Sequence, residues 1–277
     1  MLVSLLDRLR RNKSTAPPVS RKIGNGRDQQ QKNPVPAPTP DPARERVMVL
    51  LIGGQSNASN NGELYEEADD PRILNLHDGR CWIARHPLLG SPRRGASPWI
   101  AAARALLEGG AAERVVLIAT AVGGSSIKSW SPPDGEFYRR MLDRMHESER
   151  AGLPVTQLLW IHGEHDAVHG TPGDVYESGL ASMINGARAA LGREIPAYIA
   201  IASLCREFPP HKEIRTAQRS VAKRCPNTFV ALDCDTLGFE HRYDGVHFCE
   251  SGLRVVADGF ARAMMAEARK ALSRPLA

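Results

Sequence analysis

Four short segments of the chain carry residue types that together suit nucleophilic catalysis. They read GQSN at 54–57, GGSS at 123–126, HGEHD at 162–166 and DGVH at 244–247. Between them they offer a hydroxyl, flexible glycines with free N–H groups, carboxylates and histidines, which are complementary groups for such a reaction. The segments therefore predict an active site built around a serine.

We expect Ser56 to be the nucleophile and His247 to be its base. A serine hydroxyl is a poor nucleophile at neutral pH until a base takes its proton, and histidine, with an unperturbed pKa of about 6.5, suits that task. Asp244 lies three residues before His247, and Gly245 permits a tight turn that folds the carboxylate onto the same imidazole. Ser56, Asp244 and His247 are thus the predicted catalytic triad.

The oxyanion that develops during acyl transfer needs hydrogen-bond donors aimed at it. The sequence offers the backbone N–H of Ser56, an N–H from Gly123 or Gly124, and a side chain from the segment 162–166. We expect these groups to form the oxyanion hole.

Each of these residues also has an ordinary structural explanation. Ser56 can cap a helix, paired glycines can form a tight turn, Asp244 before a glycine suits a turn, and a lone His247 can be a hydrogen-bonded structural residue. Catalysis is favoured because four separate loops offer complementary roles, and no single residue carries the argument.

The elements that position these segments are short apolar strands alternating with amphipathic helices. Strands are expected at 47–53, 115–123, 155–163, 197–203 and 228–233, and helices at 97–109, 135–151, 173–191, 210–224 and 250–272. Such alternation predicts parallel βαβ units with helices on both faces, a three-layer α/β/α sandwich over residues 47–277. Ligands of such sheets bind beyond the carboxyl ends of the strands, where the four polar segments are expected.

Residues 1–46 form a basic tail. They hold ten Lys or Arg against four Asp or Glu, so the rest of a chain of net charge +5 carries a net charge of −1. A nearly neutral body excludes nucleic-acid binding as the expected function, because phosphate binding needs a basic face on the folded part.

The Pro- and Gln-rich composition of residues 1–46 predicts disorder. Residues 1–11 are either a frayed end or a short amphipathic contact with a membrane surface, and without a recognisable export signal we expect a cytoplasmic protein.

No metal or other cofactor is expected. The histidines and carboxylates of HGEHDAVH at 162–169 match neither the HExxH nor the HxxEH spacing. The five cysteines include no CxxC pair, which excludes a zinc ribbon or a thioredoxin-type motif as the expected site.

The four segments, extended to GGSSIKSW at 123–130, WIHGEHD at 160–166 and DGVHF at 244–248, resemble the blocks of the SGNH hydrolases. More narrowly, they resemble the branch that contains the carbohydrate esterase family six acetylxylan esterases and the sialate O-acetylesterases. The resemblance extends over residues 47–272. It implies a flavodoxin-like α/β/α sandwich, the same triad, and removal of acetyl groups from sugar hydroxyls without a metal.

The third segment departs from the pattern of that branch, which usually has Gln where this chain has His162. Because a histidine N–H can donate as an amide does, we assign the third oxyanion donor to His162. Separately, we assign substrate binding to Gln55, Trp130 and Glu164. Packing remains an alternative for Trp130, and support of the loop remains one for Glu164.

The resulting hypothesis is a serine esterase that removes small acyl groups, acetyl by resemblance, from an acetylated saccharide through an acyl-enzyme intermediate. Two alternatives remain open: a lipase or thioesterase of the same fold, and a noncatalytic carbohydrate-binding module on that fold.

Overall fold

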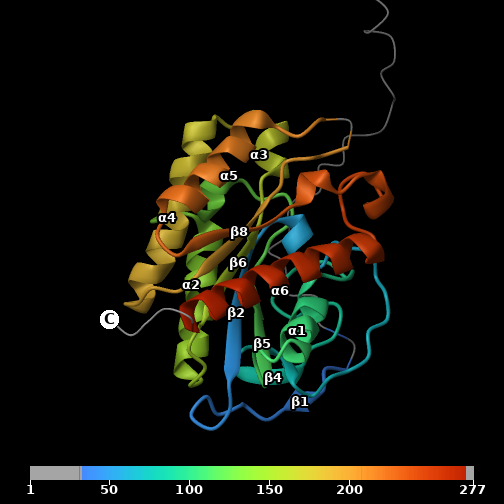
Figure 1. Ribbon diagram of the computed structural model, residues 1–277, viewed down its shortest axis with the longest axis vertical. Helices are drawn as coiled ribbons and strands as arrows, with labels where there is room; N and C mark the ends of the chain where they lie inside the picture. Colours follow the sequence, from blue (N-terminus) through green and yellow to red (C-terminus); the bar gives the residue numbers. More distant parts are fainter. Residues whose placement is uncertain (1–30, 32, 207, 273–277) are drawn as a thin grey trace, which may run out of the picture.

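A mixed sheet of eight strands forms the centre of the computed structural model, which describes residues 31, 33–206 and 208–272 (Figure 1). The strands are β1 (Pro36–Ala37), β2 (Val47–Gly54), β3 (Ile73–His77), β4 (Arg80–Ile83), β5 (Arg114–Ala119), β6 (Gln157–Ile161), β7 (Ala197–Ile201) and β8 (Thr228–Asp233). Their order in the sheet is β1-β4-β3-β5-β2-β6-β7-β8.

The strands from β3 to β8 along this order are parallel, and β4 and β1 extend the sheet antiparallel at one edge. Strands β5-β2-β6-β7-β8 keep the 2-1-3-4-5 order of flavodoxin-like sheets. The chain leaves β2 for one side of the sheet and later enters β6 on the other side of β2, which makes the carboxyl end of β2 a topological switch point. The segments at 54–57 and 162–166 follow these two neighbouring strands.

Helices cover both faces of the sheet. They are α1 (Trp99–Glu108), α2 (Glu136–Arg150), α3 (Glu164–Val168), α4 (Gly173–Leu191), α5 (Lys212–Arg224) and α6 (Glu250–Leu272). Helices α1 and α6 pack on one face, and α2, α4 and α5 on the other (Figure 1). The predicted α/β/α sandwich is thus confirmed. None of the described helices is long and apolar enough to cross a membrane.

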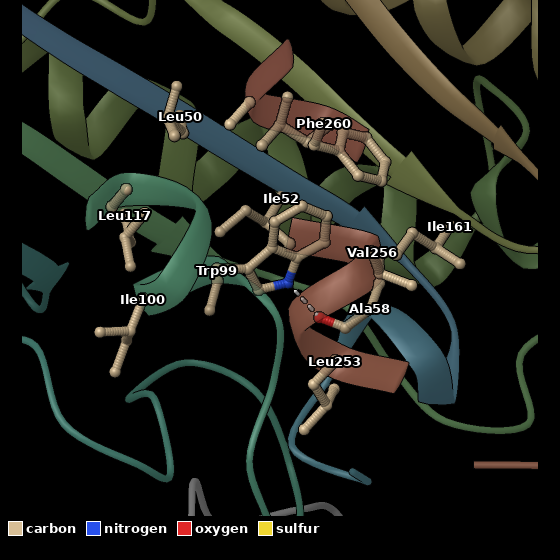
Figure 2. Close-up of a cluster of buried hydrophobic side chains, with 14 of the residues drawn as sticks. Leu50, Ile52, Ala58, Trp99, Ile100, Leu117, Ile161, Leu253, Val256 and Phe260 are labelled. Atoms are coloured by element: carbon tan, nitrogen blue, oxygen red, sulfur yellow. Dashed lines mark hydrogen bonds between the residues drawn. The ribbon is translucent and has the colours of Figure 1, made fainter. Parts of the chain in front are cut away.

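The buried core between the sheet and helices α1 and α6 also holds the turn that contains Ser56 (Figure 2). Trp99 is fully buried, and its indole Nε1 donates to the carbonyl oxygen of Ala58 at 2.6 Å. The Trp99 ring packs edge-on against Phe260, with 5.0 Å between the ring centroids. The short 3-10 turn η1 (Ser56–Ala58) is therefore anchored to the α1/α6 layer.

Disorder was predicted for residues 1–46, but residues 33–46 are ordered, so the prediction is wrong for this segment. Pro36–Ala37 pairs antiparallel with β4, and the carbonyl oxygen of Val35 accepts from the N–H of Ile83 at 2.9 Å. An extended Pro-rich segment can pair at a sheet edge even though its prolines lack N–H groups, because only one side of an edge strand must bond. Residues 1–30 and 32, which include the predicted amphipathic start, lie outside the described residues.

Replacing Trp99 with Phe removes the donor to Ala58 and leaves that buried carbonyl without its partner. We expect the free energy of unfolding to fall by about 2 kcal/mol or more, the range for a buried acceptor that loses its bond together with lost packing. Urea denaturation measures this loss. The control is Trp82→Phe, because Nε1 of Trp82 lies 3.4 Å from its acceptor, the His77 carbonyl, at a partly buried position. Equal losses in both variants would contradict the role assigned to Trp99.

Candidate active site

Asp244 and His247 form a hydrogen-bonded pair in a tight turn before α6. Asp244 Oδ2 lies 2.7 Å from His247 Nδ1, and Asp244 Oδ1 accepts from the backbone N–H groups of Val246 and His247 at 2.9 and 2.7 Å. Gly245, with φ of +79°, makes the turn without the strain that a side chain would bring. The carboxylate therefore fixes both the turn and the orientation of the imidazole.

The electrostatics of this turn keep the carboxylate charged. Burial raises the pKa of the Asp244 carboxyl, but hydrogen bonds from the backbone and ring of His247 and from the Val246 N–H outweigh burial and hold this pKa below its usual range. An ionised Asp244 can stabilise the imidazolium that forms when His247 takes a proton.

Ser56 lies directly beyond the carboxyl end of β2 and is 5% exposed. Its neighbour Asn57 donates through Nδ2 to the carbonyl oxygen of Val246 at 3.2 Å, so the serine turn contacts the turn that carries His247. Among the described residues, no hydrogen bond joins Ser56 Oγ to the His247 ring, and such bonds often tighten only when substrate binds. The structure thus brings the front and rear segments of the predicted triad side by side.

The loop with Gly123 and Gly124 adjoins the same serine. The N–H of Val122 donates to the carbonyl oxygen of Gly54 at 2.9 Å, which ties this loop to the end of β2. The position that a Cβ on Gly123 would occupy lies 3.5 Å from Ser56 Cβ, and both glycines are exposed. Glycine here leaves room for a reacting group beside the serine, and backbone N–H groups for an oxyanion.

His162 does not have the predicted place in the oxyanion hole. It is fully buried, its Nε2 lies 3.1 Å from the carbonyl oxygen of Ser125, and its Nδ1 lies 3.1 Å from the hydroxyl of Tyr176. Burial lowers the pKa of His162 to about 4, although nearby Asp166 opposes this. With both ring nitrogens bonded inside the protein, His162 has no donor left for an oxyanion.

The hydrogen bonds of this buried cluster assign the protons. The carbonyl oxygen of Ser125 can only accept, so its bond with His162 Nε2 requires a proton on that nitrogen. The carbonyl oxygen of His162 accepts from the Tyr176 hydroxyl at 2.9 Å and from Gln218 Nε2 at 2.7 Å. A neutral His162 then carries its own proton on Nε2 and donates it to Ser125. His162 therefore positions the loop that contains Gly123 and Gly124.

Gln55 and Glu164 are also buried links, which corrects the prediction that they contact substrate. Gln55 Oε1 accepts from the N–H groups of Gly163 and His165 at 3.1 and 3.3 Å. Glu164 Oε1 accepts from Asn57 Nδ2 at 2.6 Å, and burial raises the pKa of Glu164 against this hydrogen bond. Both side chains join the loop after β2 to the loop after β6.

Trp130, the third predicted substrate contact, is likewise a packing residue. It is fully buried, its Nε1 donates to Ser125 Oγ at 2.8 Å, and its ring packs edge-on against Trp160 at 5.1 Å between centroids. The alternative of packing, open from the sequence, is the one that the structure supports.

The remaining polar residues of the segment 162–169 support the loops as well. Asp166 accepts from the N–H of Ile127 at 3.0 Å and from the Thr171 hydroxyl at 2.7 Å. The rings of His165 and His169 stack, with 3.9 Å between their centroids. Among the residues that the structure describes, no group of three or more His, Cys, Asp or Glu is arranged to hold a metal ion.

Sequence reasoning missed two residues that border the predicted triad. The Tyr243 ring stacks on the His247 ring at 6.0 Å between centroids, and its hydroxyl donates to the carbonyl oxygen of Asn61 at 2.9 Å. Asn61 Oδ1 lies 3.2 Å from the position of a Cβ on Gly123. Tyr243 directly precedes Asp244 in the chain, which is the only signal that could have drawn attention to it.

A flavodoxin-like sheet that carries GQSN after its first core strand and an Asp–His pair before its last helix defines an SGNH-type hydrolase. A sequence model of one family within this class, "Carbohydrate esterase, sialic acid-specific acetylesterase", matches residues 46–266. The chain belongs to that family.

Individual relatives are distant. A probable carbohydrate esterase of Arabidopsis thaliana is 24% identical over 163 residues, which are 50% of this chain and 62% of the relative. The X-ray structure of that plant protein has a TM-score of 0.68 at 22% identity and covers 80% of this chain and 98% of its own. A carbohydrate acetylesterase from Xanthomonas citri has a TM-score of 0.55 at 19% identity and covers 79% of this chain and 55% of its own. At these identities the likeness shows the shared fold.

The buried neutral state of His162 makes stability depend on pH. Its pKa is about 4 in the folded protein, below the ordinary value of 6.5, so the unfolded chain takes up a proton first as pH falls. The contribution of neutral His162 to the free energy of unfolding is fully present above pH 6.5, the pKa of the unfolded chain. It is lost as the pH falls toward about 4, the pKa in the folded protein. Between pH 7 and pH 5 we expect a loss of about 2 kcal/mol in the free energy of unfolding from this group.

Denaturation of the protein and of His162→Gln at both pH values measures this loss. The wild-type decrease between pH 7 and pH 5 should exceed that of the variant, whatever the variant's stability at pH 7. His146→Gln is the control, because His146 is exposed on α2. An unchanged pH dependence in His162→Gln would show that His162 is not held neutral by burial.

Proposed function

We propose that the protein is a serine esterase that removes O-acetyl groups from carbohydrate, with Ser56, His247 and Asp244 as its triad. The observation that carries the proposal is the 2.7 Å bond between Asp244 and His247 in a turn that the serine turn contacts through Asn57. Membership of a carbohydrate esterase family supports an acetylated sugar as the substrate.

In the first step, His247 removes the Oγ proton of Ser56 as this oxygen attacks the carbonyl carbon of the acetyl ester. A bond forms between Oγ and that carbon, and the former carbonyl oxygen becomes an oxyanion. Backbone N–H groups of Ser56 and of the Gly123–Gly124 loop are the donors that we assign to it. The ionised Asp244 stabilises the imidazolium of His247.

Formation of the acyl-enzyme is completed when the bond between the acetyl carbon and the sugar oxygen breaks. The sugar oxygen takes the proton from His247 and leaves as a hydroxyl, while the acetyl group remains on Ser56. A water molecule then gives a proton to His247 and attacks the acetyl carbon. Release of acetate returns the proton to Ser56 and restores the free enzyme.

The burial of Ser56 supports a small acyl group. Only 5% of this residue is exposed, and Asn61 and Gly123 lie beside it. A short acetyl group fits such a site with little displacement of its neighbours, whereas a long acyl chain needs an apolar channel.

Replacement of Ser56 by Ala removes the nucleophile. We expect kcat/KM for 4-nitrophenyl acetate to fall by at least about 10⁴-fold, because the triad acts as a unit. Ser251→Ala is the matched control, since Ser251 is exposed at the start of α6 and takes no part in the site. Unfolding curves of both variants establish that they are folded. Hydrolysis by folded Ser56→Ala at the wild-type rate would rule out the mechanism.

Acyl chain length separates an acetylesterase from a lipase or thioesterase of the same fold. We expect kcat/KM for 4-nitrophenyl esters to be highest for acetate and to fall about tenfold or more by octanoate, because the neighbours of Ser56 leave little room. Acetate release from acetylated saccharides then identifies the sugar. Rates that grow with chain length would favour the lipase function, and sugar binding without hydrolysis of any ester would favour a noncatalytic module.

A further inference from the structure

Asn57 and Glu164 are two buried side chains that link the segments of the predicted triad. Each is 3% exposed, and Asn57 Nδ2 donates to Glu164 Oε1 at 2.6 Å. The same amide nitrogen carries a second proton and donates to the carbonyl oxygen of Val246 at 3.2 Å. The pair therefore joins the turn with Ser56, the loop after β6 and the turn with His247.

One oxygen atom on each of these two side chains has no hydrogen-bond donor. In the described part of the chain, nothing donates to Asn57 Oδ1 or to Glu164 Oε2, and both atoms are buried. Such buried, unpartnered polar atoms are rare in folded proteins and call for an explanation. An amide oxygen and an ionised carboxylate oxygen are both acceptors, so neither can satisfy the other. A single proton on the carboxyl group would satisfy both.

The charge of an ionised Glu164 would also lack a partner. No cation among the described residues forms an ion pair with it. Arg242 lies within electrostatic reach, but its guanidinium group donates to the backbone carbonyl oxygens of Cys234, Leu237 and Val246. A buried carboxylate without an ion pair is costly, and such a group commonly keeps its proton.

The other titratable groups around Glu164 leave this balance in place. Burial raises the pKa of the Glu164 carboxyl, and the charge of Asp235 in the 3-10 turn η3 (Cys234–Thr236) acts in the same direction. Together they outweigh the amide hydrogen bond and the nearby guanidinium group, which lower this pKa. Burial also raises the pKa of Tyr176 on α4 and of Cys234, so both stay neutral. The surroundings thus favour the protonated acid.

We propose that Glu164 is a neutral carboxylic acid whose Oε2–H donates to Asn57 Oδ1, so that acid and amide form a cyclic pair with two hydrogen bonds. The second bond fixes the rotation of the Asn57 amide, and through it the carbonyl group of Val246 beside His247. Glu164 is then a positioning residue for the triad, a role that rests on the proposed function. Its proton stays within the pair and takes no part in acyl transfer.

An infrared difference spectrum between the protein and Glu164→Gln tests for this proton directly. The carbonyl stretch of a protonated carboxyl group is distinct from the stretches of a carboxylate, and ¹³C-labelled glutamate shifts it. At pH 7 we expect the wild type to show a protonated-carboxyl band that the label shifts and that Glu164→Gln lacks. Loss of carboxylate bands alone in Glu164→Gln would overturn the proposal.

Glu136→Gln is the matched control for the spectrum. Glu136 is exposed at the start of α2, and its replacement should leave the protonated-carboxyl band in place.

Two substitutions separate the proton of Glu164 from its charge in kinetics. Glu164→Gln offers an oxygen and an N–H in place of Oε1 and Oε2–H, whereas Glu164→Met fills the space and offers neither. For 4-nitrophenyl acetate we expect kcat of Glu164→Gln to stay within about threefold of wild type. In Glu164→Met it should fall at least about tenfold, with KM within about twofold. Unfolding curves establish that both variants are folded.

A loss of kcat in folded Glu164→Gln as large as in Glu164→Met would show that the charge is required, and would overturn the proposal. The infrared test decides the matter even where Glu164→Met fails to fold. Failure of the esterase function is distinguishable, since Ser56→Ala would then hydrolyse 4-nitrophenyl acetate as fast as wild type, while the infrared band would still report the state of Glu164.

Discussion

The side-chain amide of Asn57 holds together the segments from which the site is built. Its Nδ2 donates to Glu164 Oε1 and to the carbonyl oxygen of Val246, partners that lie 107 and 189 residues away in sequence. All of these groups are buried, and a buried polar group that loses its partner costs more than an ordinary hydrogen bond contributes. The bond pattern therefore favours one arrangement of the serine turn, the loop after β6 and the histidine turn.

The same principle extends outward from Asn57 to the rest of the site. Gln55 and His162 each connect two loops, and Trp130 ties together the loop 123–130, through hydrogen bonds that are shielded from water. In such an environment hydrogen bonds are stronger than in water, and networks of them rigidify the structure that they span. Because the loops that carry reactive groups are cross-linked by polar side chains, a hydroxyl and an imidazole from opposite ends of the chain can be held in a fixed relation.

Much of the fold could be predicted from the sequence, because apolar runs ended by glycine mark buried parallel strands. The predicted strand at 47–53 and helix at 173–191 correspond closely to β2 and α4. Strand β3 was missed because Asn75 interrupts its apolar run. Asn75 is nevertheless buried, since its Nδ2 donates to the carbonyl oxygens of Leu89 and Leu117. Its place depends on partners distant in sequence.

The site likewise has parts that the sequence could predict and parts that depend on tertiary packing. The spacing of Asp244, Gly245 and His247 defines a local turn, so the bond between the carboxylate and the ring could be predicted from the sequence. Whether His162 and Trp130 face a substrate or the interior depends on which helices cover them, and no local pattern contains that information. A family resemblance assigns positions, whereas burial decides which of the side chains at those positions remain accessible.

The short strand Pro36–Ala37 has a consequence for the integrity of the sheet. It occupies the outer edge of β4, where the N–H of Ile83 bonds the carbonyl oxygen of Val35. An uncovered edge presents open backbone donors and acceptors to other chains, and proline in the covering strand offers little for a further strand to pair with. Residues 35–37 thus protect this edge against intermolecular β-pairing, and a version of the protein that lacks them would lose that protection against aggregation.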